Sequence, residues 1–253
     1  MSAIGMELRK LKRRRYWLMA AGAAGLELAW IASASGMRAT GAPQLRLLGF
    51  TLNEAMSLVG MLVPLVAALL ASRLATVDTE ERMGSLLTAL GQPGRARFGA
   101  KLTVGSFALV LGQLSVLAFV ALVAPSMGMR TTAAYQDAVG PAIVVVVAAS
   151  VAAMAVQLAL ATCIEKQAIG LAVGAIAGFV CSGLPSAQLE ALGWLLPWGI
   201  ATAASPISRL ATFQTGVPVT VAQPWAGALF AVVAAVIWTT AAALAIIHQE
   251  NHR

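Results

Sequence analysis

The chain has 253 residues, of which 59% are apolar and only 11% are charged, with a mean hydropathy of +0.83. A soluble domain carries roughly a quarter charged residues, so this composition excludes an ordinary soluble fold. The net charge of +7 does not indicate nucleic-acid binding, because the basic residues cluster beside apolar stretches and no nucleic-acid motif accompanies them.

The chain begins with a basic amphipathic segment, residues 1–15. Ile4, Leu8 and Leu11 share one face of a helix there, and basic residues cover the rest. This pattern is typical of a helix that lies on an anionic leaflet, and equally of a positive anchor for the span that follows. The two interpretations are compatible.

The rest of the sequence predicts an all-α polytopic membrane protein with a single membrane domain over residues 1–253. Six apolar stretches are candidates to cross a hydrocarbon core of roughly 30 Å. Their predicted ranges are 16–36, 51–74, 100–124, 141–164, 168–184 and 225–247. Pro64 predicts a kink in the second span.

Residues 185–224, between the last two spans, are interrupted by prolines. The apolar run 192–200 is too short to cross, which is typical of a re-entrant or surface-lying segment, and both alternatives stay open. Trp194 and Trp198 fit the headgroup level.

The distribution of basic residues predicts the orientation. With both termini in the cytoplasm, thirteen of the 17 Lys and Arg lie inside, and four lie outside: Arg38, Arg46, Arg130 and Arg209. Glu54, at the outer start of the second span, can pair with Arg38 or Arg46.

The loop after the second span predicts a short amphipathic helix over residues 78–91. Asp78 is the expected N-cap, with Glu81 at the capping-box position, and Gly91 and Pro93 are stop signals. The apolar stripe of this helix is Met83, Leu86, Leu87 and Leu90. A helix of this kind between two spans indicates contact with a partner.

Two further features lie inside the spans. Gly170, Gly174 and Gly178 form a doubled G-x-x-x-G, which predicts close helix packing within the chain, a dimer contact or a moving seam. Glu27 should face protein or water at its depth. The alternatives are a polar group that lines a substrate path or gate, a hydrogen bond to a neighbouring helix, and a protonated acid.

The sequence contains no P-loop, no metalloprotease or serine-hydrolase motif and no spaced metal-ligand set. No catalytic or metal-binding residue is therefore predicted. Cys163 and Cys181 are read as small buried residues.

The chain resembles the permease subunit of a type-2 ABC exporter, closest to the small bacitracin and lantibiotic self-protection permeases. The residues that carry the resemblance are the charged start Glu7 to Arg14, then Glu80, Glu81, Gly84, Leu86, Leu87, Pro93, Arg95 and Lys101, and the broken segment between the last two spans.

This resemblance implies that residues 78–91 are a coupling helix that docks on a separate ABC ATPase. Met83, Leu86, Leu87 and Leu90 would insert into the ATPase, and Glu80, Glu81 and Arg82 would contact its rim. ATP and Mg would bind the ATPase, with no cofactor in this chain. A second permease, identical or different, would complete an exporter of an amphipathic peptide, antibiotic or lipid in the inner or plasma membrane. The alternatives are a secondary carrier or channel without an ATPase, and a membrane anchor or assembly protein.

Overall fold

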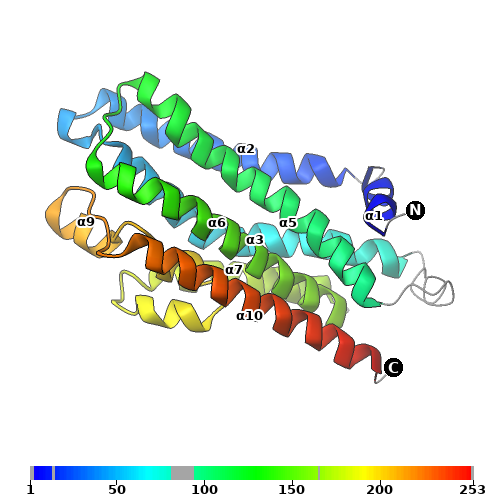
Figure 1. Ribbon diagram of the computed structural model, residues 1–253. Coiled ribbons are helices and arrows are strands. Elements are labelled where there is room, and N and C mark those ends of the chain that lie inside the picture. Colours follow the sequence, from blue (N-terminus) through cyan, green and yellow to red (C-terminus); the bar gives the residue numbers. More distant parts are fainter. Residues whose placement is uncertain (1–2, 13–14, 81–93, 165, 252–253) are drawn as a thin grey trace.

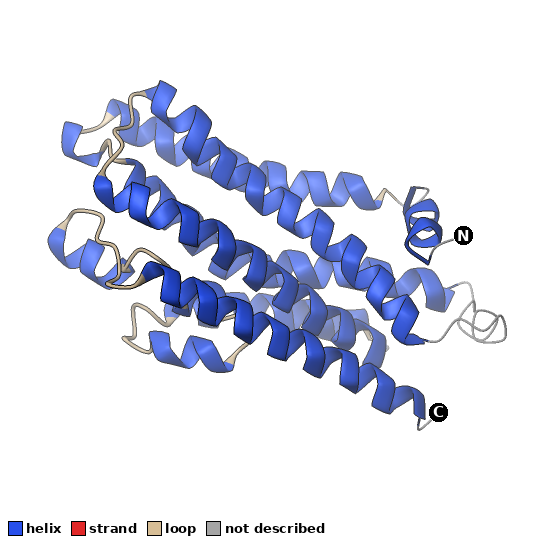
Figure 2. Ribbon diagram, in the orientation of Figure 1, coloured by secondary structure: helices blue, strands red, loops and turns tan. Residues whose placement is uncertain are grey.

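The computed structural model describes residues 3–12, 15–80, 94–164 and 166–251. Within these residues every named element is a helix. The β contacts recorded there are two isolated bridges, Leu47 with Arg130 and Ile207 with Thr220. Figure 2 shows the same helical architecture by colour. The all-α class predicted from composition is confirmed for this part of the chain.

Long helices lie side by side in one bundle (Figure 1). They are α2 (Tyr16–Thr40), α3 (Leu48–Glu80), α5 (Gly94–Ala118), α6 (Ala133–Cys163), α7 (Gln167–Gly183) and α10 (Pro224–Asn251). The short helices are α1 (Ala3–Lys12), η1 (Pro43–Leu45), η2 (Phe119–Val123), η3 (Ala124–Met127), η4 (Glu190–Leu195), α8 (Ile200–Ala203) and α9 (Arg209–Thr215). Both termini and α1 lie at one end of the bundle, and α9 lies at the other.

Helices α3 and α6 form the centre of the bundle. In each, 67% of the most apolar window is buried, against 22% in α2 and α10. Helix α6 packs against α10, α3 and α5. Its buried positions are rich in alanine, including Ala148, Ala149, Ala152 and Ala153. Small side chains let helix backbones approach closely, and this explains how α6 packs tightly against α3, α5 and α10.

Among the residues that the structure describes, five helices are long and apolar enough to cross a membrane: α2, α3, α5 with its extension, α6 and α10. Helix α7 is a shorter apolar helix of 17 residues, about 25 Å long against a core of roughly 30 Å. A multi-pass membrane protein is therefore supported, and a sixth span at 168–184 stays a prediction.

Several of the predicted boundaries were wrong. Helix α6 begins at Ala133 rather than 141, because Thr132 is its N-cap and its Oγ1 accepts a hydrogen bond from the Tyr135 N–H at 3.3 Å. Pro141 lies inside that helix. The third span is α-helical only to Ala118, after which a π-helical turn, η2, and a 3-10 turn, η3, continue it.

The segment between α7 and α10 folds as short helices and turns. Ile200 and Ala201 of α8 are buried, and α8 packs against α3, α6 and α10. Helix α9 has a Ser208 N-cap and ends at Gly216, whose φ of 68° is in the left-handed region. A re-entrant placement of 185–224 in the membrane stays a prediction.

Candidate functional site

Lys101 joins α5 to α3 at the end of the bundle that carries the termini. This lysine is only 3% exposed, and its Nζ donates a hydrogen bond to the Leu74 carbonyl at 2.7 Å. The bond joins the start of α5 to the last turns of α3. Helix α1 packs on α5 and α2 at the same end, with Leu11 buried and Ile4 and Leu8 exposed. The helix ends that flank the predicted coupling segment are therefore held against each other.

Most of the predicted coupling residues lie outside the described residues. These are Glu81, Arg82, Met83, Leu86, Leu87 and Leu90. The prediction of a coupling helix over 78–91 is accordingly neither confirmed nor contradicted for them.

Asp78 and Glu80 lie within the described backbone and correct one detail. Helix α3 continues to Glu80 rather than ending at 74, so Asp78 has the backbone of an α3 residue and not of the N-cap of a new helix. The physical reason is that no Gly or Pro follows Leu74 before Glu80, so nothing stops the helix there.

Glu27 bonds to a neighbouring helix in the interior of the bundle. Its Oε2 accepts a hydrogen bond from Gln113 Nε2 at 2.7 Å, and both residues are 2% exposed. Glu27 Oε1 and Gln113 Oε1 are both buried with no hydrogen-bond partner recorded. Glu27 thus joins α2 to α5, and a role for it on a substrate path stays a prediction.

The three glycines of α7 have different surroundings. A Cβ on Gly178 would lie 2.1 Å from the Met61 carbonyl oxygen, and one on Gly174 would lie 2.7 Å from the Pro64 oxygen. A Cβ on Gly170 would meet nothing within 4 Å. Gly174 and Gly178 therefore bring α7 into close contact with α3, and Gly170 takes no part in that contact.

The end of the bundle that carries α9 holds a charged pair. Arg38 and Glu54 form an ion pair, and Trp30 Nε1 donates to the other Glu54 oxygen at 3.0 Å. The predicted pairing of Glu54 with Arg38 is confirmed. Arg46 instead donates from Nη2 to the Gly41 carbonyl at 3.0 Å.

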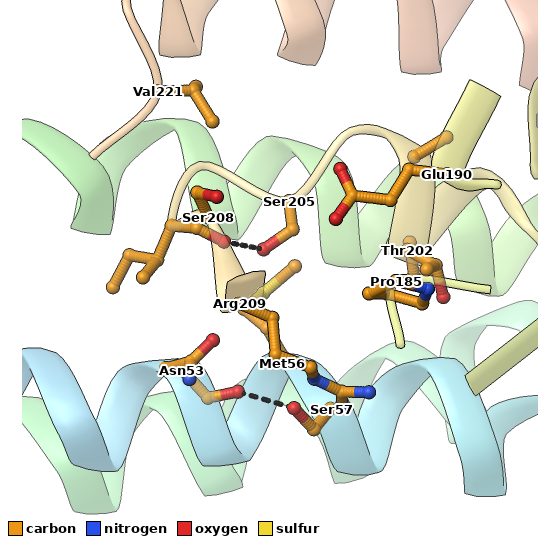
Figure 3. Close-up of a pocket in the computed structure, with 13 residues that line it drawn as sticks. Asn53, Met56, Ser57, Pro185, Glu190, Thr202, Ser205, Ser208, Arg209 and Val221 are labelled. Carbon is orange, nitrogen blue, oxygen red and sulfur yellow. Dashed lines mark hydrogen bonds between the residues drawn. The ribbon is translucent and has the colours of Figure 1, made fainter. Parts of the chain in front are cut away.

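A polar pocket lies near the same end, between the first turns of α3 and the segment from η4 to α9 (Figure 3). Its volume is about 50 Å³. Its charged and hydroxyl-bearing lining residues are Ser57, Glu190, Thr202, Ser205, Ser208 and Arg209. Sequence reasoning missed this pocket, because it treated Arg209 only as an outer charge and did not consider Glu190.

Arg209 is the central residue of the polar pocket. Its Nη1 donates to the Ser182 carbonyl at 2.7 Å, in the last turn of α7. That carbonyl belongs to the negative end of the helix dipole, which favours a nearby cation. Burial lowers the pKa of the Arg209 guanidinium, and the Glu190 carboxylate partly offsets this by raising it. Arg209 remains a cation, because an unperturbed guanidinium titrates far above neutral pH.

Among the described residues, no group of three or more His, Cys, Asp or Glu side chains could hold a metal ion. Cys163 and Cys181 are free thiols. The described features thus tie helices together and form one polar pocket.

Comparison with known protein families gives one match. Residues 3–182, from the start of α1 to the end of α7, match the family described as ABC-2 family transporter protein. No curated protein matches the chain.

Proposed function

Because the chain belongs to the ABC-2 family of transporter proteins, we propose that it is the permease of an ATP-driven exporter and works with a separate ATPase subunit. The family match carries this proposal, since it covers the first five long helices and the loop predicted to be the coupling helix. The membrane permease assignment follows from the family and the apolar helices. The direction of transport, the ATPase and the substrate are the proposed parts.

The proposed mechanism is mechanical. ATP binding would draw the partner ATPases together, and the loop between α3 and α5 would pass their movement to the spans. The Lys101–Leu74 hydrogen bond supports this mechanism, because it joins the two helices that enter and leave the loop. A force applied to the loop would then reach α3 and α5 together.

We place the termini in the cytoplasm, on the side of the proposed ATPase. The charge distribution supports this, since α1 and the start of α5, which together carry Arg9, Lys10, Lys12, Arg95, Arg97 and Lys101, lie at the end that carries both termini. A second permease, identical or different, would complete the transporter. An amphipathic peptide, antibiotic or lipid is the proposed cargo.

Purification tests the proposal. The tagged chain is extracted from its native membrane in mild detergent, and the proteins that accompany it are identified. We expect an ATPase with a Walker A sequence at a fixed ratio to the permease. Transport by the purified chain alone, driven by an ion gradient and indifferent to ATP, would instead support a secondary carrier.

A further inference from the structure

The polar pocket beside Arg209 has no part in the proposed coupling mechanism, and it lies near the end of the bundle away from the loop between α3 and α5. Figure 3 shows the Glu190 carboxylate and the Arg209 guanidinium entering the pocket from different elements, with no hydrogen bond between them. A carboxylate and a guanidinium that line one cavity without forming an ion pair leave room for a ligand that has both a cationic and an anionic group.

The guanidinium supplies the donors of the pocket. One N–H group of Arg209 is used by the Ser182 carbonyl. No nitrogen of Arg209 is recorded as both fully enclosed and unpartnered, so its other donors are at least partly exposed, and Arg209 lines the pocket. A guanidinium presents donors in a planar fork that matches the oxygens of a phosphate or carboxylate.

The acceptors come from Glu190 and two serines. Ser57 Oγ donates to the Asn53 carbonyl at 2.8 Å, and Ser205 Oγ donates to the Ile207 carbonyl at 2.9 Å. With their protons engaged, both hydroxyl oxygens offer only lone pairs. Together with the Glu190 carboxylate, they suit the N–H donors of an ammonium group.

A second cavity of about 320 Å³ shares Arg209 and Pro185 with the polar pocket. It is lined by Leu210 and Phe213, and Phe213 is 88% exposed. The guanidinium therefore stands between a small polar cavity and a larger apolar one. A phospholipid has the same order of groups: ammonium, phosphate and acyl chain.

We propose that this site binds a phospholipid whose headgroup carries a primary ammonium and a phosphate, as in phosphatidylethanolamine. The phosphate lies on Arg209, the ammonium lies near Glu190 and Ser205, and an acyl chain passes along Leu210 and Phe213. The site discriminates by hydrogen bonding, because the quaternary ammonium of phosphatidylcholine has no N–H to donate.

Native mass spectrometry of the purified full-length chain tests this proposal without ATP or any ATPase, so its failure leaves the transport proposal untouched. The protein is titrated with phosphatidylethanolamine, phosphatidylcholine and phosphatidylglycerol of the same chains. We expect phosphatidylethanolamine to be retained about tenfold better than phosphatidylcholine, the effect of roughly one charge-assisted hydrogen bond.

Three variants locate the site. Glu190→Gln should bring phosphatidylethanolamine and phosphatidylcholine to near-equal retention, and Arg209→Gln should lower the retention of all three lipids. Arg46→Gln is the matched control, since Arg46 also donates to a backbone carbonyl at this end but lies outside the pocket. It should behave as the unmodified chain. If Arg209→Gln does not fold, the lipid ratio of Glu190→Gln decides alone.

Equal retention of the ethanolamine and choline lipids by the unmodified chain overturns the proposal. The same loss in Glu190→Gln and Arg46→Gln also overturns it. Soluble glycerophosphoethanolamine is added as a competitor. If it displaces the lipid at equal concentration, the site takes the free headgroup and the assignment of the apolar cavity is wrong. If Arg209→Gln impairs peptide export while lipid preference is unchanged, the pocket binds a peptide instead.

Discussion

Gly178 has the tightest backbone contact of the three glycines in α7. The Gly178→Ala substitution would place a methyl group 2.1 Å from the Met61 carbonyl oxygen, so α7 and α3 would have to separate. We expect a destabilisation of about 1–3 kcal/mol, as for other overpacked interiors. Thermal unfolding in detergent measures it.

Gly170→Ala is the matched control on the same helix. A methyl group there meets nothing within 4 Å, and alanine is the better helix former by roughly 0.5–1 kcal/mol. Gly170→Ala should leave the melting temperature unchanged or raise it. Equal losses in the two variants would contradict the assignment of the α7–α3 contact to Gly178.

The Glu27–Gln113 pair makes a second prediction at the residue scale. Gln113→Leu removes the donor and leaves a buried carboxyl group without its partner, which costs about 1–3 kcal/mol. The double variant Glu27→Leu with Gln113→Leu should recover part of this loss, because both polar groups are then gone. A double-mutant cycle on thermal unfolding gives the coupling, and strictly additive effects would contradict it.

The sequence predicted that Glu27 faces protein or water, but not which residue it meets. The depth of an acid in a span is read from hydropathy alone, whereas Gln113 is 86 residues away on another helix. Which residues meet depends on the rotation of α2 and α5 about their axes. Lys101 is a similar case. It bonds to the backbone carbonyl of Leu74, and an apolar leucine side chain does not indicate that its carbonyl will accept a hydrogen bond.

Among the elements, the loop between α3 and α5 carries the strongest functional prediction. Leu87→Asp places a charge in the predicted apolar stripe and should abolish co-purification of the ATPase. Membrane insertion should be unaffected, because the residue lies outside every predicted span. The measurement is the ratio of ATPase to permease after affinity purification.

Ser85→Asp provides the control, since Ser85 lies on the opposite face of the predicted helix. It adds the same charge and should retain the ATPase. Full retention in Leu87→Asp would show that the stripe is not the docking face.

The start of α6 is signalled in the sequence, whereas the π-helical turn η2 is not. Thr132 before Ala133 is an N-cap signal for α6, but Pro141 is also a typical helix start, and it favoured the later predicted boundary. Proline early in a helix is tolerated more readily than in its interior. The π-helical turn of η2 had no such signal: its residues, Phe119 to Val123, are ordinary apolar residues of a span.

At the scale of the whole molecule, the number of membrane crossings depends on whether α7 spans the membrane. A sixth span puts Lys166 on the side of the termini and Thr215 on the opposite side. We expect a membrane-impermeant maleimide to label Thr215→Cys in intact cells, and to label Lys166→Cys only after permeabilisation. Cys163 and Cys181 are first replaced by Ala.

The same result at both positions in intact cells, both protected or both labelled, would mean that α7 does not cross.

The architecture of the bundle was only partly predictable from the sequence. Composition indicated a helical membrane protein, but α10 and α6 are similarly apolar stretches in the sequence. Their different places, at the edge and at the centre, follow from side-chain size and three-dimensional contacts.

The glycine contacts fall on the stretch of α3 that contains Pro64, where the helix lacks one backbone hydrogen bond and is easiest to bend. Gly174 and Gly178 pack directly against the carbonyl groups of Pro64 and Met61, so there is no space between α7 and α3 at this contact. Bending of α3 near Pro64 would therefore move α7 with it. The two helices should behave as one rigid unit in any such motion.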